Sequence, residues 1–263
     1  MEKIKIKSRS EIEAMQRSGR AASLLLQRIG EAVAPGVSTH ELDQISRKTI
    51  EELGGISSFL GYQLPDHEPY PATICASINE EIIHGIPSRE IILDDGDIIG
   101  IDTAILLGDF HADNAFTFAV GEISPEARQL LDVTRKSLYE SINVARPGNR
   151  LGDVCHAVQS CVEAHGFSVA RDFVGHGIGR SMHELPQVPN FGEPDKGIRL
   201  RPGMVLAIEP MVNVGTCEAA VLDDGWTAVT ADRSLSAHFE HTVAILSDGP
   251  EILTYNAELW GGA

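Results

Sequence analysis

Two aspartates interrupt a stretch of sequence that otherwise has the composition of two β-strands. Asp102 follows the apolar run at 98–101, and Asp113 lies beyond the pair Leu107-Gly108. If Leu107-Gly108 forms the two-residue loop of a hairpin, the two aspartates are directly opposite each other. Opposed carboxylates repel each other, and burial makes this worse unless a cation or a shared proton lies between them. The pair therefore indicates a divalent metal site, with a shared proton or a different strand register as the alternatives.

A histidine and two glutamates also lie in surroundings that rarely hold such side chains. His176 lies between two glycines, where a tight turn would leave its imidazole open to a ligand. Glu209 interrupts the apolar run at 205–212, and Glu240 comes just before the apolar run at 242–246. A loop histidine is usually only solvated, and a lysine or arginine from elsewhere could pair with either glutamate. Neither run contains such a residue, however, and this favours metal binding.

Together these side chains make an oxygen-rich set of ligands. The set has four carboxylates and one histidine, and it contains no cysteine. It suits two divalent metal ions (Co, Mn, Fe or Zn), which carboxylates could bridge. Ions of this kind lower the pKa of bound water to about 7 in favourable sites. The chemistry predicted from these residues is therefore metal-assisted hydrolysis.

Helices and strands would have to position these ligands. Capping boxes of Ser10 with Glu13 and of Ser38 with Glu41 each begin a helix, and Ser124 begins a third. Strands that follow helices predict an α+β fold with one central sheet. The helices would begin near residues 10, 38, 124 and 151, and the strands would cover residues 72–78, 97–106, 110–120, 204–214, 226–230 and 237–246.

The two parts of the chain resemble each other in the spacing of their turns. The same number of residues separates Gly36 from Gly54 and Gly148 from Gly166, and a proline precedes the first glycine of each pair. Apolar positions of the helices between these glycines also coincide. This match predicts one domain built from two related halves. The domain would cover residues 1–263, with halves at about 1–121 and 122–263.

The composition disfavours several classes of partner. The chain has 21 Lys and Arg against 38 Asp and Glu, and its net charge of −17 disfavours binding to nucleic acid or to an anionic membrane. No apolar run reaches the roughly 18 residues of a membrane span, and the N-terminal sequence lacks the hydrophobic segment of a signal peptide. The four cysteines have no CxxC spacing, which predicts free thiols in a cytoplasmic protein.

The candidate ligands also lie in motifs of a known family. They resemble the complete metal-ligand set of the methionine aminopeptidases: Asp102 and Asp113 at their separation, His176 in GHGIG, Glu209 in IEP and Glu240 in SAHFEHT. The resemblance covers nearly the whole chain. It extends to the motifs Ser77-Ile78-Asn79-Glu80, His84-Gly85-Ile86-Pro87 and Asp224-Gly225-Trp226-Thr227.

The resemblance implies a pita-bread fold, in which two pseudo-twofold related halves with a curved antiparallel sheet enclose a site for two metal ions. In that family the counterparts of Asp113 and Glu240 bridge the ions. The counterpart of Asp102 binds one ion, and those of His176 and Glu209 bind the other. Glu209 would also carry the proton of the attacking water.

The resemblance further implies which residues handle the substrate. His84 and His183 would contact the substrate and stabilise the tetrahedral intermediate without binding metal. The loop at 63–69 is longer than the usual bacterial one, so it leaves the positions of the tyrosines on either side of it open. An apolar pocket would hold the methionine side chain, and its lining residues, which could equally be core residues, would include Phe59, Tyr62, Tyr70, Cys75, Met182 and Trp226.

The implied activity is removal of the N-terminal methionine from nascent polypeptides whose second residue is small. The spacing between Glu209 and Glu240 is too short for the helical insertion of the type II enzymes, so the chain resembles the short bacterial type I form. A cytoplasmic monomer would fit this activity. The ribosome is a further candidate partner, although the acidic charge disfavours docking to its RNA. Two alternatives stay open: a proline-specific aminopeptidase or prolidase with the same fold, and a pita-bread protein that binds partners without catalysis.

Overall fold

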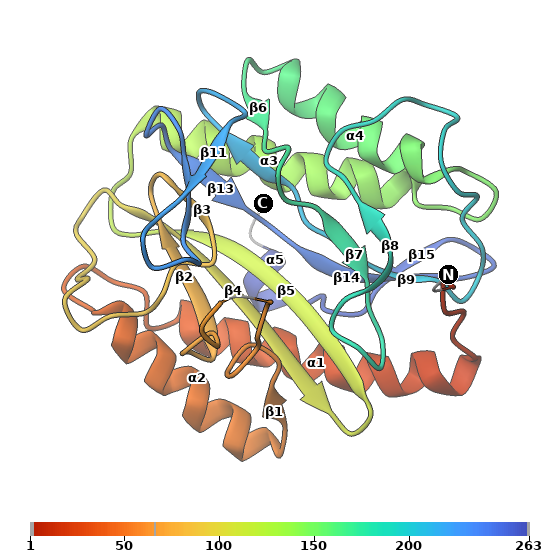
Figure 1. Ribbon diagram of the computed structural model, residues 1–263, viewed down its shortest axis with the longest axis horizontal. Coiled ribbons are helices and arrows are strands. Elements are labelled where there is room, and N and C mark those ends of the chain that lie inside the picture. The colour runs from red at the N-terminus through yellow and green to blue at the C-terminus, as the bar shows by residue number, and fades with distance from the viewer. Residues whose placement is uncertain (1–2, 66, 262–263) are drawn as a thin grey trace.

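A central layer of strands lies between two pairs of helices (Figure 1). The computed structural model describes residues 3–65 and 67–261, and Asp66, in the long loop at 63–69, lies outside the described residues. None of the helices in the described part of the chain is long and apolar enough to span a membrane. The helices are α1 (Arg9–Gly30), α2 (Thr39–Leu53), α3 (Pro125–Val144), α4 (Leu151–Glu163) and the short α5 (Ala257–Trp260).

Helix α1 begins two residues earlier than predicted. Its capping box is formed by Ser8 and Glu11, so the predicted box at 10–13 was wrong. The backbone N–H of Lys7 donates a hydrogen bond of 2.7 Å to the carbonyl of Gly203. This bond holds Lys7 outside the helix, and the first residue free to act as the cap is Ser8. The predicted starts of α2 and α3 are confirmed.

All strand pairings among the described residues are antiparallel, and hydrogen bonds divide the strands among four sheets. The first sheet contains β1 (Ile56–Ser57), β2 (Ile74–Ile78), β4 (Ile98–Leu107) and β5 (Phe110–Ala119). The second contains β6 (Ser168–Val169), β10 (Met211–Asn213) and β13 (Ser236–His238), and the third contains β3 (Glu81–Ile83), β11 (Ala219–Val221) and β12 (Ala228–Thr230). The fourth has the order β15 (Pro250–Ile252), β14 (His241–Ile245), β9 (Val205–Ile208), β7 (Gly175–Gly177) and β8 (Glu184–Val188).

Two of the predicted strands are each divided at a candidate ligand. The strand predicted at 204–214 becomes β9 and β10, and β9 ends immediately before Glu209. The strand predicted at 237–246 becomes β13 and β14, and β14 begins immediately after Glu240. Pro210 has no N–H to give to a ladder, which accounts for the first interruption. Both glutamates therefore lie at strand ends rather than inside a ladder.

The β4–β5 hairpin has a different register from the predicted one. Its two-residue loop begins at Gly108, which has a φ of 63° and therefore suits the left-handed position of a tight hairpin loop. Asp102 pairs with Ala115 and Asp113 pairs with Ala104, so the prediction that the aspartates are directly opposite was wrong. Moving the loop by one residue moves the pairing by two. Because side chains alternate with a period of two, both aspartates still lie on one face, as diagonal neighbours.

The helices bury apolar faces against these strands from two sides. Leu25, Leu26 and Ile29 of α1 pack in one cluster with Ile74 of β2 and Ile99 of β4. A second cluster joins α3 and α4 to β9, β13 and β14. A fully buried side chain of this size contributes roughly 1.5–3 kcal/mol. The two clusters hold the strands that carry the candidate ligands.

Candidate metal centre and substrate pocket

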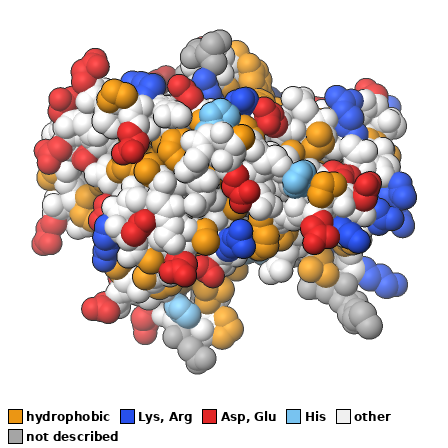
Figure 2. All heavy atoms as spheres, turned by 90° about the horizontal axis from the view of Figure 1, so that it is seen from above, with side chains coloured by type: hydrophobic (Ala, Val, Ile, Leu, Met, Phe, Trp, Pro, Cys, Tyr) orange, Lys and Arg blue, Asp and Glu red, His pale blue; other side chains and the backbone are white. Residues whose placement is uncertain are grey.

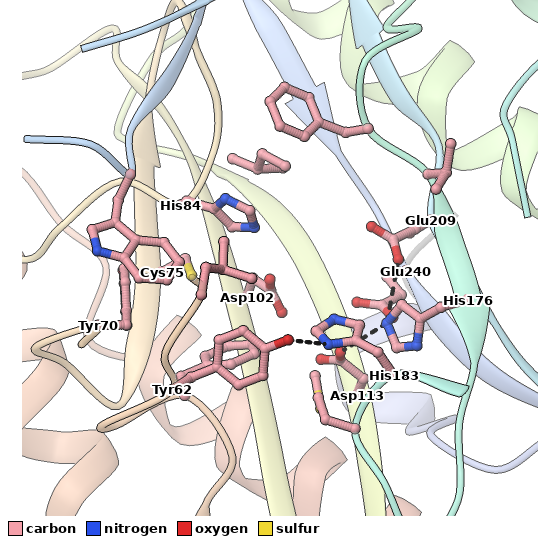
Figure 3. A pocket seen from close by; sticks show the side chains of 17 residues that line it. Tyr62, Tyr70, Cys75, His84, Asp102, Asp113, His176, His183, Glu209 and Glu240 are labelled. Atoms are coloured by element: carbon pink, nitrogen blue, oxygen red, sulfur yellow. Dashed lines mark hydrogen bonds and ion pairs between the residues drawn. The ribbon is translucent and has the colours of Figure 1, made fainter. Parts of the chain in front are cut away.

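The five candidate ligands come together on the wall of one cavity of about 230 Å³. Asp102 lies on β4 and Asp113 on β5, whereas His176 lies on β7, Glu209 follows β9 and Glu240 precedes β14. Figure 3 shows their side chains pointing into the same space. Strands from distant parts of the chain therefore supply one cluster.

The ligand atoms are close enough to share metal ions. Asp113, His176 and Glu240 each offer one ligand atom within 4.8 Å of the other two. Nε2 of His176 lies 3.7 Å from an oxygen of Asp113 and 3.6 Å from an oxygen of Glu209. One buried oxygen of Asp102, one of Asp113 and one of Glu240 have no hydrogen-bond partner among the described residues. Buried carboxylate oxygens without partners indicate that a cation belongs between them.

Burial makes the charges of this cluster costly. It raises the pKa of Asp113 to about 7. Burial, with repulsion from Asp113 as the next cause, raises the pKa values of Asp102, Glu209 and Glu240 well above their usual range. Burial also lowers the pKa of His176 to about 4, so its imidazole is neutral at pH 7. No lysine or arginine among the described residues lines the cavity. The donor set therefore fits two divalent cations, which would offset the carboxylate charges.

The glycines around His176 permit a strand and not the predicted turn. Strand β7 runs through Gly175, His176 and Gly177. A Cβ on Gly175 would lie 2.5 Å from the carbonyl oxygen of Ala207, and one on Gly177 would lie 2.4 Å from that of Leu185. Glycine is therefore needed for the close approach of the neighbouring strands. Nδ1 of His176 donates to the Gly177 carbonyl at 2.9 Å, since a carbonyl can only accept, and this leaves the lone pair of Nε2 for a metal.

Two more histidines predicted from the family resemblance line the same cavity. The Tyr62 hydroxyl and Nδ1 of His183 form a hydrogen bond of 2.8 Å (Figure 3), and the His183 ring centroid lies 4.4 Å from that of His176. His84 has a φ of 61°, and its ring lies edge-on to Trp226. A non-glycine residue held in this region indicates a constrained position. Burial lowers the pKa of both His84 and His183 to about 4, so both are neutral at pH 7.

An apolar wall lies beside the ligand cluster. The long loop at 63–69 does not displace the tyrosines, because hydrogen bonds close its base. The N–H of Tyr70 donates to the carbonyl of Tyr62 at 2.8 Å, and the N–H of Gly61 donates to the carbonyl of Tyr70 at 2.9 Å. All six predicted pocket residues line the cavity: Phe59, Tyr62, Tyr70, Cys75, Met182 and Trp226.

Sequence reasoning missed several residues of this site. Leu64 of the long loop reaches the cavity, and its apolar character among polar neighbours was the available signal. His238 was also missed, although it lies in the same motif as Glu240, and its Nε2 is 3.7 Å from an oxygen of Glu209. His238 lies behind Glu209 and not on the cavity wall; besides Leu64, the lining residues that were not predicted are Ile83, Phe173 and Val174.

Residues 13–247 match metallopeptidase family M24. The chain belongs to this family. This M24 chain is 49% identical over 249 residues to a methionine aminopeptidase of Clostridium acetobutylicum, and the alignment covers 95% of this chain and 98% of that one. Its structure is similar to that of methionine aminopeptidase from Thermotoga maritima, with a TM-score of 0.93 and 42% identity over 97% of this chain and 100% of that one.

The M24 fold is shared with enzymes of different substrate. A prolidase from Pyrococcus horikoshii has a TM-score of 0.74 at 19% identity, with 95% of this chain and 63% of that chain covered. At that level of sequence identity, the similarity shows a shared fold and not a shared substrate. The predicted family, the α+β pita-bread fold and a metal-dependent aminopeptidase are confirmed.

Proposed function

We propose that this M24 enzyme is a type I methionine aminopeptidase, which removes the N-terminal methionine from polypeptides whose second residue is small. One observation carries the proposal: buried carboxylates with unpaired oxygens and an apolar wall meet in a single cavity. The carboxylates supply a place for hydrolysis, and the wall supplies a place for one apolar side chain. A cavity of about 230 Å³ suits a single large side chain rather than an extended peptide.

The five clustered side chains would hold two metal ions. In this assignment Asp113 and Glu240 would serve both ions, Asp102 would be a ligand of one, and His176 with Glu209 would be ligands of the other. The mutual closeness of Asp113, His176 and Glu240 and the free Nε2 of His176 support it. When bound, two divalent ions (Co, Mn, Fe or Zn) would lower the pKa of a water molecule and polarise the carbonyl of the scissile bond.

Glu209 is positioned to carry a proton. Burial and repulsion from Asp113 and Asp102 raise its pKa well above the usual range, which makes it a stronger proton acceptor than an exposed glutamate. One of its oxygens lies near Nε2 of His176 and the other near Nε2 of His238. We infer that Glu209 accepts a proton from the attacking water and passes it to the departing amine.

The neutral histidines of the cavity would act on the substrate. When the Tyr62 hydroxyl donates to Nδ1 of His183, Nε2 of His183 carries the N–H and can donate to the substrate carbonyl oxygen as negative charge develops there. His84 lies beside Trp226 on another part of the wall, where it can contact the substrate backbone.

The apolar wall would select methionine. Tyr70, Cys75 and Trp226 form one buried cluster, and Phe59 and Tyr62 pack against it. A thioether packs favourably beside aromatic rings, and its flexible chain fills an irregular pocket. Met182 lies on the same cavity wall.

The proposal extends to the organisation and setting of the chain. Residues 1–263 would form one catalytic domain of two halves, since residues 1–121 contain α1 and α2 and residues 122–263 contain α3 and α4, in the same order before most of their strands. The enzyme would act as a monomer in the cytoplasm on nascent chains. Its charge of −17 argues against docking to ribosomal RNA, and Figure 2 shows acidic side chains spread widely over the face in view.

Peptide cleavage by the metal-loaded protein tests this function. We expect release of methionine from Met-Ala-Ser, with release from Met-Leu-Ser about a hundredfold slower because a bulky second residue meets the rim of the cavity. A chelator should remove both activities. Equal cleavage of a Xaa-Pro peptide would replace the proposal with a proline-specific enzyme. Metal binding without cleavage of any of these peptides would favour a protein that binds partners without catalysis.

His183→Ala should separate substrate handling from metal binding. Its ring contacts Tyr62 and lies beside His176, but it is not among the proposed ligands. We expect kcat to fall about a hundredfold while the stoichiometry of bound metal stays at two, because one donor to the developing oxyanion is lost. His40→Ala, on α2, is the control and should leave both quantities unchanged. Loss of metal from His183→Ala would refute this division of roles.

A further inference from the structure

Threonine hydroxyls join the two chain segments that carry Asp113 and Glu240. The backbone N–H of Asp113 donates to Oγ1 of Thr242 at 3.0 Å, and the same hydroxyl donates to the Asp113 carbonyl at 2.8 Å. Farther along β5, the hydroxyl of Thr117 makes the same two kinds of hydrogen bond with the backbone of His238. It accepts from the His238 N–H at 2.9 Å and donates to the His238 carbonyl at 2.8 Å.

These contacts have the register of an antiparallel strand pair. Between the two threonines, the N–H of Glu240 donates directly to the carbonyl of Ala115 at 2.9 Å. Each successive contact moves two residues forward along β5 and two residues back along the other segment. Nevertheless, β5 forms a regular ladder only with β4 among the described strands, because two of the three contacts pass through a side-chain hydroxyl. The three contacts are Asp113 with Thr242, Ala115 with Glu240, and Thr117 with His238.

A hydroxyl can replace a ladder partner because it both donates and accepts. One threonine therefore satisfies both backbone groups of the residue opposite, while its side chain keeps the two backbones farther apart than a direct N–H to carbonyl bond would. Thr242 is fully buried and Thr117 is 1% exposed. Loss of either hydroxyl would thus leave two buried backbone groups unpaired.

The position of these segments matters because each carries a carboxylate with an unsupported oxygen. One oxygen of Asp113 and one of Glu240 have no hydrogen-bond partner in the described structure. Their location therefore depends on the backbone that carries them. Thr242 is a rigid anchor for that backbone, since its own N–H donates to Oγ1 of Thr254 at 3.1 Å and its carbonyl accepts from the N–H of Leu253 at 2.9 Å.

We propose that Thr242 and Thr117 are positioning residues that set the separation of the segments carrying Asp113 and Glu240, and thereby the metal affinity of the site. The hydroxyls act as spacers: too short a separation would crowd the carboxylates, and too long a separation would prevent both from reaching the same ions. The inference rests on the proposed role of Asp113 and Glu240 as metal ligands.

Binding of Mn²⁺ to the metal-free full chain, measured by calorimetry, tests the proposal. Thr242→Val keeps the shape and removes the hydroxyl, and it should weaken Mn²⁺ binding about 10- to 100-fold, as loss of groups that orient metal ligands does in other sites. Thr242→Ser keeps the hydroxyl and should bind within a few-fold of wild type. Thr134→Val is the matched control, because Thr134 is equally buried and its hydroxyl donates only to the Leu130 carbonyl within α3. It should leave Mn²⁺ affinity unchanged.

A folded Thr242→Val protein that binds Mn²⁺ as tightly as wild type would overturn the inference. The same holds if Thr134→Val weakens binding as much. If Thr242→Val does not fold, Thr117→Val decides between the same two results, since it removes the second spacer. Failure of the proposed function has a different signature: wild-type protein would bind Mn²⁺ but leave Met-Ala-Ser intact, while the threonine variants would still differ in Mn²⁺ affinity.

Discussion

Glu240→Gln is expected to abolish metal binding and peptide cleavage together. The change keeps the size of the side chain but removes a charge from the cluster that Glu240 forms with Asp113 and His176. Loss of a ligand that holds both ions should cost several kcal/mol of transition-state stabilisation, which corresponds to at least about a thousandfold in kcat/KM. Metal content after purification and cleavage of Met-Ala-Ser are the two measurements.

The Glu240→Gln protein should still be folded. Its stability therefore distinguishes loss of a metal ligand from loss of the fold. In the metal-free protein the Glu240 carboxylate is destabilised by burial and by repulsion from Asp113 and Glu209. A neutral amide removes that repulsion, so the metal-free variant should be at least as stable as metal-free wild type at pH 8. Glu140→Gln, on the exposed face of α3, is the control and should keep metal and activity. Normal turnover by Glu240→Gln would remove Glu240 from the ligand set.

Metal-free protein is expected to lose stability as the pH rises from 6.5 to 8. The pKa of Asp113 is raised to about 7, and those of Asp102, Glu209 and Glu240 are raised well above the usual range, all with burial as the largest cause. A group whose pKa is higher in the folded state stabilises the fold below its unfolded pKa, and this stabilisation is lost as the pH rises through the folded pKa. Each group that keeps its proton only in the folded state lowers the free energy of unfolding by about 1.4 kcal/mol per pH unit, so stability should fall across this range.

The pH window is chosen so that other groups do not hide this effect. Burial lowers the pKa of His84 and His176 to about 4 and that of His238 and His241 to about 3. Their contribution has the opposite sign: it increases as the pH rises through about 6.5 and levels off roughly one pH unit above that value, so the upper half of the window reports the carboxylates alone. Below pH 8, the thiols of the unfolded chain are still mostly protonated.

Denaturant unfolding of chelator-treated protein at several pH values measures this slope. Metal-loaded protein should show little of it, because bound cations keep the carboxylates ionised and paired in the folded state. Glu240→Gln provides the matched variant, since it removes one titrating group and should reduce the slope. Stability that is constant or rises from pH 6.5 to 8 in metal-free wild type would contradict the buried, mutually repelling cluster.

Much of the local structure was predictable because its signals lie close together in the sequence. The box of Ser38 with Glu41 predicted the start of α2, and Ser124 predicted that of α3. The α1 start was wrong because two overlapping boxes are possible there, and the choice between them depends on a bond from Lys7 to Gly203, which is distant in the sequence. Local patterns cannot distinguish between two equally good local solutions.

The hairpin shows the same limit within the site. Apolar runs predicted both strands, but the register of Asp102 and Asp113 depended on which residue begins the loop. The error left the aspartates on one face because a loop moved by one residue moves the pairing by two. Both aspartates therefore still line the cavity, although the predicted opposition was wrong. The error at His176 had another cause. The two glycines beside it suggested a turn, but they lie in a strand, where the close approach of Ala207 and Leu185 leaves no room for a Cβ.

The sequence by itself determined the kind of chemistry. Carboxylates and a histidine within apolar runs are buried in any fold of this chain, and buried charges of this kind cost free energy unless a cation pairs with them. Motifs shared with a family added the proposed division between metal ligands and the histidines that would face substrate. Only the tertiary structure decided which oxygens lack partners, which nitrogen of His176 is free, and how Thr242 and Thr117 space the segments around Asp113 and Glu240. These facts depend on contacts between residues far apart along the chain, and no local pattern specifies such distances.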